Sequence, residues 1–208
     1  MQAPDAHLHR ADPVMARLID AYGGPLPLEP DFRGRPQDAY GALVRGITGQ
    51  QLSVKAAASI WARFLARYDG RTPTPEQILA DDPEELRVAA GFSHAKVRYL
   101  RSLAEQIVSG ELDLERLREL PDGEVVRELT AVKGIGEWTA HMFLMFTLHR
   151  PDVLATGDLG VRNAAMQAYG LDAPPGAQAL TEIAEPWRPY RTRACLYLWR
   201  SLRNEPLS

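Results

Sequence analysis

Apolar residues recur at helical spacing through almost every periodic segment of this chain, which is typical of helices that bury one face. Glycine and proline interrupt the pattern repeatedly, as at Gly23-Gly24-Pro25, so the predicted helices are short. No segment shows a clear strand pattern, and no Asn-Gly pair signals a β-hairpin. The sequence therefore predicts an all-α fold of about ten helices. These span residues 14–22, 39–47, 54–68, 75–79, 83–89, 94–108, 122–129, 137–148, 158–169, 177–184 and 190–202.

Length and composition indicate a globular chain without a membrane span. With 208 residues it can form one domain or two small lobes. No apolar run approaches the roughly 18 residues of a transmembrane helix, and the N-terminus lacks the pattern of a secretory signal. The single cysteine, Cys195, excludes an internal disulfide and any four-cysteine zinc or iron–sulfur site. We expect a cytoplasmic protein, associated with the nucleoid if the source is bacterial.

The distribution of charge is more informative than its sum. The net charge of −3 gives no indication of a nucleic-acid partner. One C-terminal stretch, however, concentrates arginines with little neighbouring acid: Arg188, Arg191, Arg193, Arg200 and Arg203. A local basic surface can bind phosphates on a protein that is acidic overall. The alternative is an ordinary solvated helix face.

A short connection between two predicted helices has the features of a phosphate site. Residues 131–140 read A-V-K-G-I-G-E-W-T-A, with Gly134 and Gly136 on either side of Ile135. Glycine lets a phosphate approach the backbone closely, and the free N–H groups at the start of the next helix form an anion site. Lys133 lies beside it, and Ile135 is predicted to anchor the hairpin in the core. The alternative is a plain tight turn.

A single carboxylate, Asp158, stands at the start of a later predicted helix, in A-T-G-D-L-G-V-R. Aspartate is common as an N-cap, which is the simplest interpretation. A helix N-terminus also favours the ionised form of a carboxylate. Such a group can stabilise positive charge that develops in a reaction. The two roles are compatible.

Together, L-x-x-V-x-G-I-G-x-W-T-A and the aspartate that follows resemble the DNA glycosylase superfamily that combines a helix–hairpin–helix with a Gly/Pro-rich loop and an aspartate (HhH-GPD). The resemblance is closest to the 3-methyladenine DNA glycosylase II (AlkA-like) branch and extends over about residues 39–203, including I-T-G-Q-Q-L-S-V-K-A-A at 47–57. It implies two helical lobes around a DNA-binding cleft. One lobe, 39–150, carries the hairpin at about 129–137. The other, 1–38 with 151–208, carries Asp158 as the catalytic residue.

The resemblance also implies the residues that contact DNA and the base. The DNA backbone would be bound by Lys133, Gly134, Ile135, Gly136, Thr139, Arg162 and Arg191. The flipped base would meet Trp138, Trp199, Gln50, Met142 and Leu159, where Met142 and Leu159 replace aromatic residues of better-known members. Aromatic faces suit a cationic base, at roughly 0.5–2 kcal/mol per contact. A core position is the alternative for Trp199.

Two further site predictions follow from the resemblance. A loop that fills the gap left by the flipped base would begin near Gln50, and either Gln51 or Leu52 would be the wedge. The alternative is a polar helix boundary. Some family members bind a monovalent cation at the hairpin, which here implies Na⁺ or K⁺ at the backbone carbonyls of Thr130, Val132 and Gly134. We expect no required cofactor and no iron–sulfur cluster.

Trp138 distinguishes between the reactions known in this superfamily. Members that also nick the strand have a lysine there, which forms a Schiff base, and tryptophan cannot. We therefore expect a monomeric, monofunctional DNA glycosylase that hydrolyses the N-glycosidic bond of alkylated bases, of the 3-methyladenine and 7-methylguanine type, in double-stranded DNA during base excision repair. The alternatives are a non-catalytic helix–hairpin–helix DNA-binding protein and a bifunctional glycosylase/lyase for oxidised bases.

Overall fold

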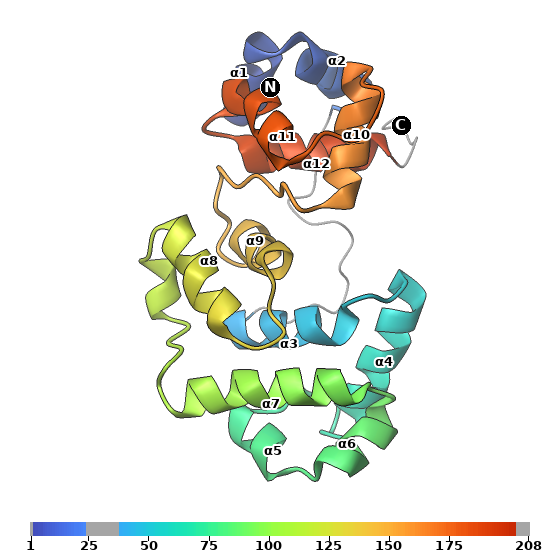
Figure 1. Cartoon of the computed structure of the whole chain (residues 1–208), viewed down its shortest axis with the longest axis vertical. Coiled ribbons are helices and arrows are strands. Elements are labelled where there is room, and N and C mark those ends of the chain that lie inside the picture. The colour runs from blue at the N-terminus through green and yellow to red at the C-terminus, as the bar shows by residue number, and fades with distance from the viewer. Residues whose placement is uncertain (1, 24–37, 203–208) are drawn as a thin grey trace. The chain divides into compact units, whose positions relative to one another are not determined.

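The described part of the chain is helical throughout. The computed structural model describes residues 2–23 and 38–202, and these ranges contain helices α1 to α12, two short 3₁₀ helices and no strand (Figure 1). The predicted all-α class is confirmed. Residues 24–37 and the last arginine of the basic stretch, Arg203, lie outside the described residues. Within those ranges, no helix has the length and hydropathy that crossing a bilayer requires.

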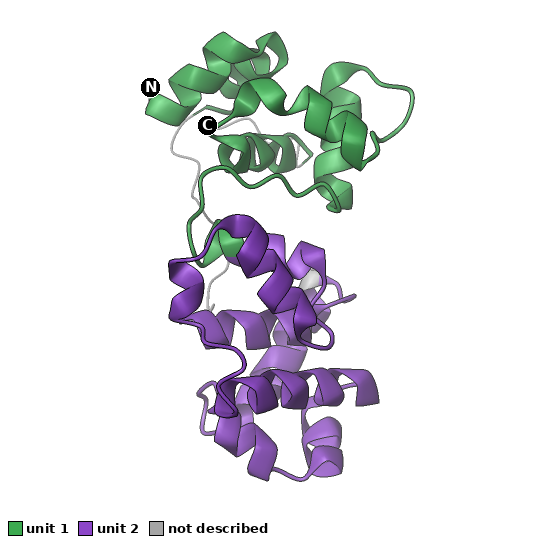
Figure 2. Cartoon of the chain, turned by 60° about the vertical axis from the view of Figure 1, so that its left-hand side comes forward, with its two compact units in different colours: residues 1–32, 144–208 green, residues 33–143 purple. Residues whose placement is uncertain are grey.

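The chain forms two compact units, residues 33–143 and residues 1–32 with 144–208 (Figure 2). The unit of residues 1–32 and 144–208 is therefore built from both ends of the sequence. The lobe boundaries expected from the sequence, at 38/39 and 150/151, lie several residues further along the chain. Helix α9 (Glu137–Phe146) begins in the unit of residues 33–143 and ends in the other unit.

The unit of residues 33–143 is organised around one long amphipathic helix, α7 (His94–Val108), whose N-cap is Ser93. Helix α7 contacts α3 and the short helices α5 and α6 (Figure 1). Leu100 and Leu103 on α7 are buried in this core with Leu43 and Ile47 of α3. The other helices of the unit are α3 (Ala39–Gly49), α4 (Val54–Ala66), α5 (Pro75–Ala80), α6 (Pro83–Ala90), η1 (Arg116–Arg118) and α8 (Asp122–Ala131).

The unit formed by the two ends of the chain is arranged around α12 (Arg191–Ser201), which contacts α1, α2 and α10. Its other helices are α1 (Ala3–Ala11), α2 (Pro13–Tyr22), α10 (Leu159–Tyr169), α11 (Ala177–Ile183) and η2 (Glu185–Trp187). The buried carboxylate of Asp12 caps α2 and also accepts hydrogen bonds from the indole N–H of Trp187, at 2.8 Å, and the hydroxyl of Tyr169. One acid thus connects both ends of the sequence.

Helix α1 was not predicted, although it packs against α2 and α12. The ends of the other α-helices lie within two residues of the predicted ends. Helix α9 ends at Phe146, two residues before the predicted end at Leu148. The backbone turns soon afterwards at His149, whose φ is +54°.

Candidate functional site

The connection between α8 and α9 is the tight hairpin that the sequence predicts. The backbone N–H of Val132 donates to the carbonyl of Leu129, at 3.1 Å, and the N–H of Ile135 donates to the carbonyl of Val132, at 3.0 Å. The side chain of Ile135 is 4% exposed, so it does anchor the hairpin in the core. Lys133 and Gly136 are exposed on either side of it. The start of α9 follows at once, so its first N–H groups border the same exposed segment.

The two hairpin glycines have different structural requirements. Gly134 has a φ of +92°, and a Cβ atom placed on it would lie 2.1 Å from the ring of Tyr99. Gly134 is therefore required both by its left-handed backbone and by the close approach of an aromatic ring. A Cβ on Gly136 would meet no protein atom within 4 Å. The first glycine is needed for the fold, whereas the second leaves the outer surface of the hairpin bare.

A glutamine side chain connects the hairpin to the end of α3. The amide nitrogen of Gln50 donates to the carbonyl of Gly134, at 2.8 Å, and lies 3.5 Å from the hydroxyl oxygen of Thr139. Gln50 was expected at the base and Thr139 at the DNA backbone. Thr139 is instead buried, with 6% exposure, and Gln50 joins the wedge loop to the hairpin. This contact defines the position of the loop relative to the hairpin.

The loop after Gln50 exposes both candidate wedge residues. Gln51 has a left-handed backbone, with φ +56°, and its side chain is exposed. Leu52 is 36% exposed. The carbonyl of Thr48 at the other side of this loop accepts a hydrogen bond from the ammonium of Lys96, at 2.8 Å. The loop is thus held at Thr48 and Gln50 while Gln51 and Leu52 face solvent, and the choice between them as wedge stays open.

In the other unit, Asp158 stands at the start of α10, and two N–H groups donate to its carboxylate. Its Oδ1 accepts from the backbone N–H of Val161, at 2.7 Å, so the predicted N-cap is confirmed. The same oxygen accepts from the indole N–H of Trp199, at 2.8 Å. Trp199 lies on α12, 41 positions away in the sequence. The structure therefore brings together two of the predicted site residues, the acid and an aromatic ring.

The remaining predicted base-contacting residues differ in exposure. Trp138, on the first turn of α9, is 44% exposed, and Leu159, the first residue of α10, is 62% exposed. Met142 is partly buried. Trp199 is also partly buried, and its ring centroid lies 6.0 Å from that of Phe146. Trp138 and Leu159 are therefore accessible to a ligand, although single exposed apolar side chains are common on protein surfaces.

Comparison with known proteins identifies the family. Residues 44–189 match the model of the HhH-GPD superfamily base excision DNA repair protein. The chain belongs to this family. It is 36% identical over 199 residues to DNA-3-methyladenine glycosylase 1 of Schizosaccharomyces pombe, with 95% of this chain and 86% of that protein covered. It is 30% identical over 171 residues to DNA-3-methyladenine glycosylase 2 of Escherichia coli, covering 78% of this chain and 57% of that protein.

Solved structures give the same result for this HhH-GPD chain. Schizosaccharomyces pombe 3-methyladenine DNA glycosylase in complex with abasic DNA has a TM-score of 0.86 and 33% identity, with 100% of both chains covered. DNA-3-methyladenine glycosidase from Bacillus halodurans has a TM-score of 0.83 and 38% identity, with 98% of this chain and 91% of that chain covered. The family that the motifs predicted is therefore confirmed.

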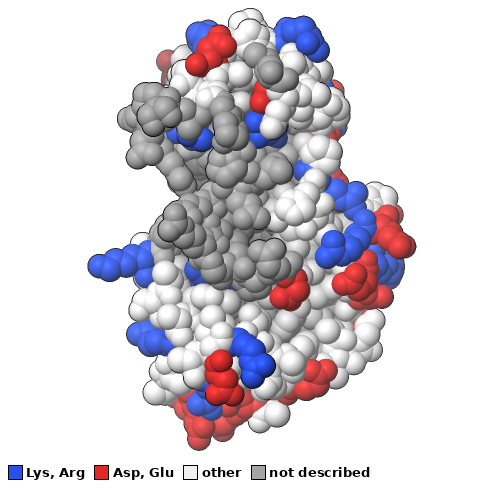
Figure 3. Space-filling model, turned by 180° about the vertical axis from the view of Figure 1, so that it is seen from behind, with Lys and Arg blue, Asp and Glu red and all other residues white. Residues whose placement is uncertain are grey.

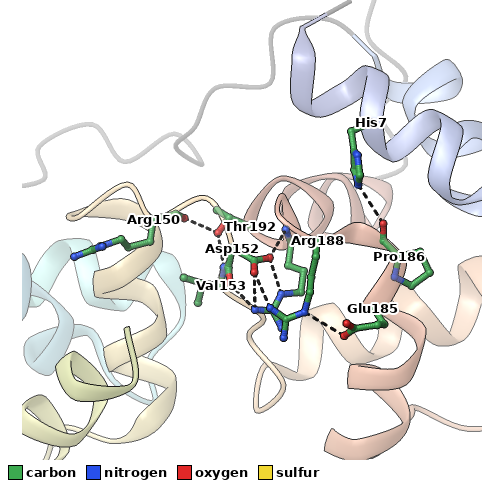
Figure 4. Close-up of polar contacts among 9 residues, drawn as sticks. His7, Arg150, Asp152, Val153, Glu185, Pro186, Arg188 and Thr192 are labelled. Carbon is green, nitrogen blue, oxygen red and sulfur yellow. Dashed lines mark hydrogen bonds and ion pairs between the residues drawn. The ribbon is translucent and has the colours of Figure 1, made fainter. Parts of the chain in front are cut away.

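The basic C-terminal stretch of this HhH-GPD protein is not the open basic surface that the sequence suggested. The guanidinium of Arg191, expected at the DNA backbone, binds the Asp152 carboxylate at 2.7 and 3.0 Å, and its side chain is 14% exposed. Arg188 binds Asp152, at 2.9 Å, and Glu185, at 3.1 Å (Figure 4). Arg193 is buried against Asp5, at 2.7 Å. The acids that neutralise these arginines are distant in sequence or on an adjacent turn.

Other predicted DNA and cation ligands already have partners within the protein. Arg162 donates to the carbonyl of Pro175, at 2.7 Å. The carbonyls of Val132 and Gly134 accept from the N–H of Ile135 and from Gln50, although each carbonyl oxygen has a second lone pair. On the face drawn in Figure 3, basic and acidic side chains are interspersed. Lys133 is therefore the predicted basic contact that remains exposed at the hairpin.

Cys195 is a core residue behind the aspartate loop. It is a free thiol with 0% exposure. Burial, and to a smaller extent the negative charge of Asp158, raise the pKa of the thiol to about 12. The thiol is therefore protonated and inert at neutral pH, and Cys195 supplies no nucleophile to the site.

The sequence did not indicate several residues that define the site. Tyr99 closes on Gly134, Phe146 packs near Trp199, and Asp152 neutralises two arginines. Each acts across a long separation in the chain, where no local spacing signals a contact. Gly160 also belongs to the site, because it lies close to Asp158 and Trp199. The sequence could have indicated this residue, since glycine within a helix is unfavourable unless space requires it.

Proposed function

We propose that this chain is a monofunctional DNA glycosylase that removes alkylated bases, of the 3-methyladenine and 7-methylguanine type, from double-stranded DNA in base excision repair. The observation that carries this proposal is the carboxylate of Asp158, held by the N–H groups of Val161 and Trp199, in a chain that also has the phosphate-type hairpin. Relatives that cover most of the chain are DNA-3-methyladenine glycosylases, and one of them is bound to abasic DNA.

The chemistry requires one correctly placed acid. As the N-glycosidic bond breaks, its electron pair leaves with the base, and positive charge develops on the deoxyribose. The negative charge of Asp158 stabilises that sugar cation. Water then adds at the sugar carbon and loses a proton, which the carboxylate can accept. The products are the free base and an abasic site.

The charge of an alkylated base explains why a second acid is unnecessary. A base such as 3-methyladenine carries a positive charge in the nucleotide and leaves as a neutral molecule, so no general acid has to protonate it. The exposed indole of Trp138 and the partly buried indole of Trp199 offer aromatic faces to such a cation. A base with an intact neutral ring gains less from these contacts.

The residue at the hairpin exit supports hydrolysis over strand cleavage. Trp138 has no amine with which to form a Schiff base. Among the lysines, Lys55 and Lys133 are exposed, and the ammonium of Lys96 donates to the carbonyl of Thr48 at 2.8 Å. The proposal includes a monomeric enzyme in the cytoplasm that requires no cofactor, with Na⁺ or K⁺ as an occupant of the hairpin carbonyls.

Measurement of released bases tests the proposal directly. Wild-type protein and Asp158→Asn are incubated with oligonucleotides that carry 3-methyladenine, 7-methylguanine, 1-methyladenine, hypoxanthine or ethenoadenine. Wild type is expected to release 3-methyladenine and 7-methylguanine. Asparagine also caps helices well, so the variant is expected to fold and to bind abasic DNA without releasing a base.

The outcomes separate the proposal from its two alternatives. Binding without base release by the wild type would indicate a DNA-binding protein without catalysis. Trapping of a protein–DNA adduct by borohydride would indicate a Schiff base and a bifunctional enzyme. Lys96 would then be the first lysine to replace, because burial lowers its pKa. Normal excision by Asp158→Asn would refute the role assigned to Asp158.

A further inference from the structure

The contact between Asp158 and Trp199 depends on the residue between the acid and the helix that follows. Gly160 is the second residue of α10. A Cβ atom placed on it would lie 2.9 Å from Oδ1 of Asp158 and 3.2 Å from both Cδ1 and Nε1 of Trp199. The first distance is shorter than real Cβ contacts, and the other two are tight. A single methyl group at this position would therefore meet both partners of the hydrogen bond.

The backbone itself does not require glycine at this position. Gly160 is not among the residues with a positive φ, and it lies within a regular helix. In a helix, alanine is more favourable than glycine because glycine loses more conformational freedom on folding. Helix propensity alone would therefore favour alanine over glycine at this position. The space beside Asp158 and Trp199 is the structural reason for glycine.

We propose that Gly160 is a positioning residue for the glycosylase reaction. Its missing side chain leaves the space in which the indole N–H of Trp199 reaches the Oδ1 atom of Asp158. Together with the N–H of Val161, that donor limits the rotation of the carboxylate. The carboxylate then presents its charge to the sugar in one orientation. This inference rests on the proposed function of Asp158 as the residue that stabilises the sugar cation.

Trp199 accordingly has two roles, one for the face of its ring and one for its N–H group. The ring contributes an aromatic surface to the base, and the N–H orients the acid. A methyl group on Gly160 would displace the indole, the carboxylate or both by a few tenths of an ångström or more. Misplacement of a reacting group by about 1 Å costs on the order of 100-fold in rate. A smaller displacement is therefore expected to slow base release while leaving DNA binding intact.

The first experiment compares Gly160→Ala with Gly157→Ala. Gly157 immediately precedes Asp158, and a Cβ there would meet nothing within 4 Å, so it is the matched control. Single-turnover release of 3-methyladenine is expected to slow by about tenfold or more in Gly160→Ala and to stay at the wild-type rate in Gly157→Ala. Affinity for abasic DNA is expected to be unchanged in both. A wild-type rate in Gly160→Ala would overturn the inference.

The second experiment tests whether the methyl group acts through Trp199. Trp199→Phe removes the N–H donor and retains an aromatic ring. Because the methyl group also meets Oδ1 of Asp158, adding Gly160→Ala to Trp199→Phe is expected to slow base release by a smaller factor than adding it to the wild type. Fully multiplicative losses would show that the methyl group does not act through Trp199 and would overturn that part of the inference. Should Gly160→Ala fail to fold, Trp199→Phe alone tests the contact: it is expected to slow base release, and a wild-type rate would overturn the inference.

A spectroscopic readout is independent of activity. In the ¹H–¹⁵N spectrum, Trp199→Phe identifies the indole N–H signal of Trp199 by its loss. That signal is expected to shift in Gly160→Ala, because its hydrogen bond to Asp158 is altered, and to stay in place in Gly157→Ala. An unshifted signal would overturn the geometric basis of the inference. If wild type releases no methylated base, the proposed function fails while this measurement still tests the contact.

Discussion

The hairpin at 129–137 and the loop that carries Asp158 are stabilised by different kinds of contact. In the hairpin, the backbone conformation itself forms the exposed surface, and one buried side chain, Ile135, anchors it. Around Asp158, side chains from α10 and α12 meet at one oxygen atom. The comparison indicates that the proposed phosphate site depends on a few consecutive residues, whereas the position of Asp158 depends on packing between distant helices. The predictions below test that difference, beginning with the largest effect.

Gly134→Ala is expected to damage the hairpin most. A non-glycine residue in a strained backbone region costs about 1–3 kcal/mol, and overpacking against the Tyr99 ring adds about 1–3 kcal/mol, so the free energy of unfolding is expected to fall by about 2–6 kcal/mol. Urea unfolding measures this loss. Gly136→Ala is the control for stability, since its Cβ would meet no protein atom within 4 Å. Equal losses in the two variants would show that the hairpin does not distinguish its glycines.

Gln50→Ala is expected to have the second-largest effect, because Gln50 is the side chain that connects the hairpin with the wedge loop. Its removal leaves the carbonyl of Gly134 without that donor, at a cost of about 1–3 kcal/mol. Urea unfolding and affinity for abasic DNA are both expected to decrease. Gln51→Ala is the matched control for stability, because an exposed side chain usually contributes within about 0.5 kcal/mol. If Gln50→Ala is as stable as Gln51→Ala, the hydrogen bond to Gly134 does not support the hairpin.

The salt dependence of DNA binding tests the contrast between the hairpin lysine and the C-terminal arginines. Each basic residue that neutralises a phosphate contributes about 0.9 to the slope of log affinity against log salt concentration. Lys133→Gln is expected to lower the slope by that amount, because Lys133 is exposed at the hairpin. Arg191→Gln is expected to leave the slope unchanged, because Asp152 already neutralises this arginine. A lower slope for Arg191→Gln would show that the ion pair opens to bind a phosphate.

Features that depend on nearby residues were predictable from the sequence. The hairpin, the buried Ile135 and the N-cap role of Asp158 follow from spacing and residue type within a few positions. The family resemblance then indicated that Trp199 belongs to the site, and the structure places it on Asp158. Local rules were sufficient wherever the backbone itself determines the feature.

Features that depend on tertiary contacts were not predictable in the same way. The arginines near residue 190 looked like a basic surface because their partners Asp5 and Asp152 are remote in sequence. The contact of Gln50 with the hairpin could not be predicted, because nothing in its neighbourhood in sequence indicates the carbonyl of Gly134. Helix α1 has no long apolar periodicity, and its stability depends on packing against α2 and α12. Charge runs and short helices therefore require the fold before they can be interpreted.

Lowering the pH is expected to destabilise the unit that contains the hairpin, through protonation of His141 on α9. Burial lowers the pKa of His141 below 6.5, and the charges of Glu137 and Asp122 oppose this shift only in part. Its Nδ1 is buried and has no hydrogen-bond partner in the described residues. Below pH 6.5 the unfolded chain binds a proton that the native histidine resists, so stability decreases as the pH falls from 6.5 to the folded pKa and then levels off. His141→Gln is expected to lose this part of the pH dependence, measured as the urea midpoint at pH 7.5 and pH 5, whereas the exposed His94→Gln is expected to keep it. If His141→Gln keeps the wild-type pH dependence, the acid sensitivity arises from another group and does not distinguish α9 from the loop that carries Asp158.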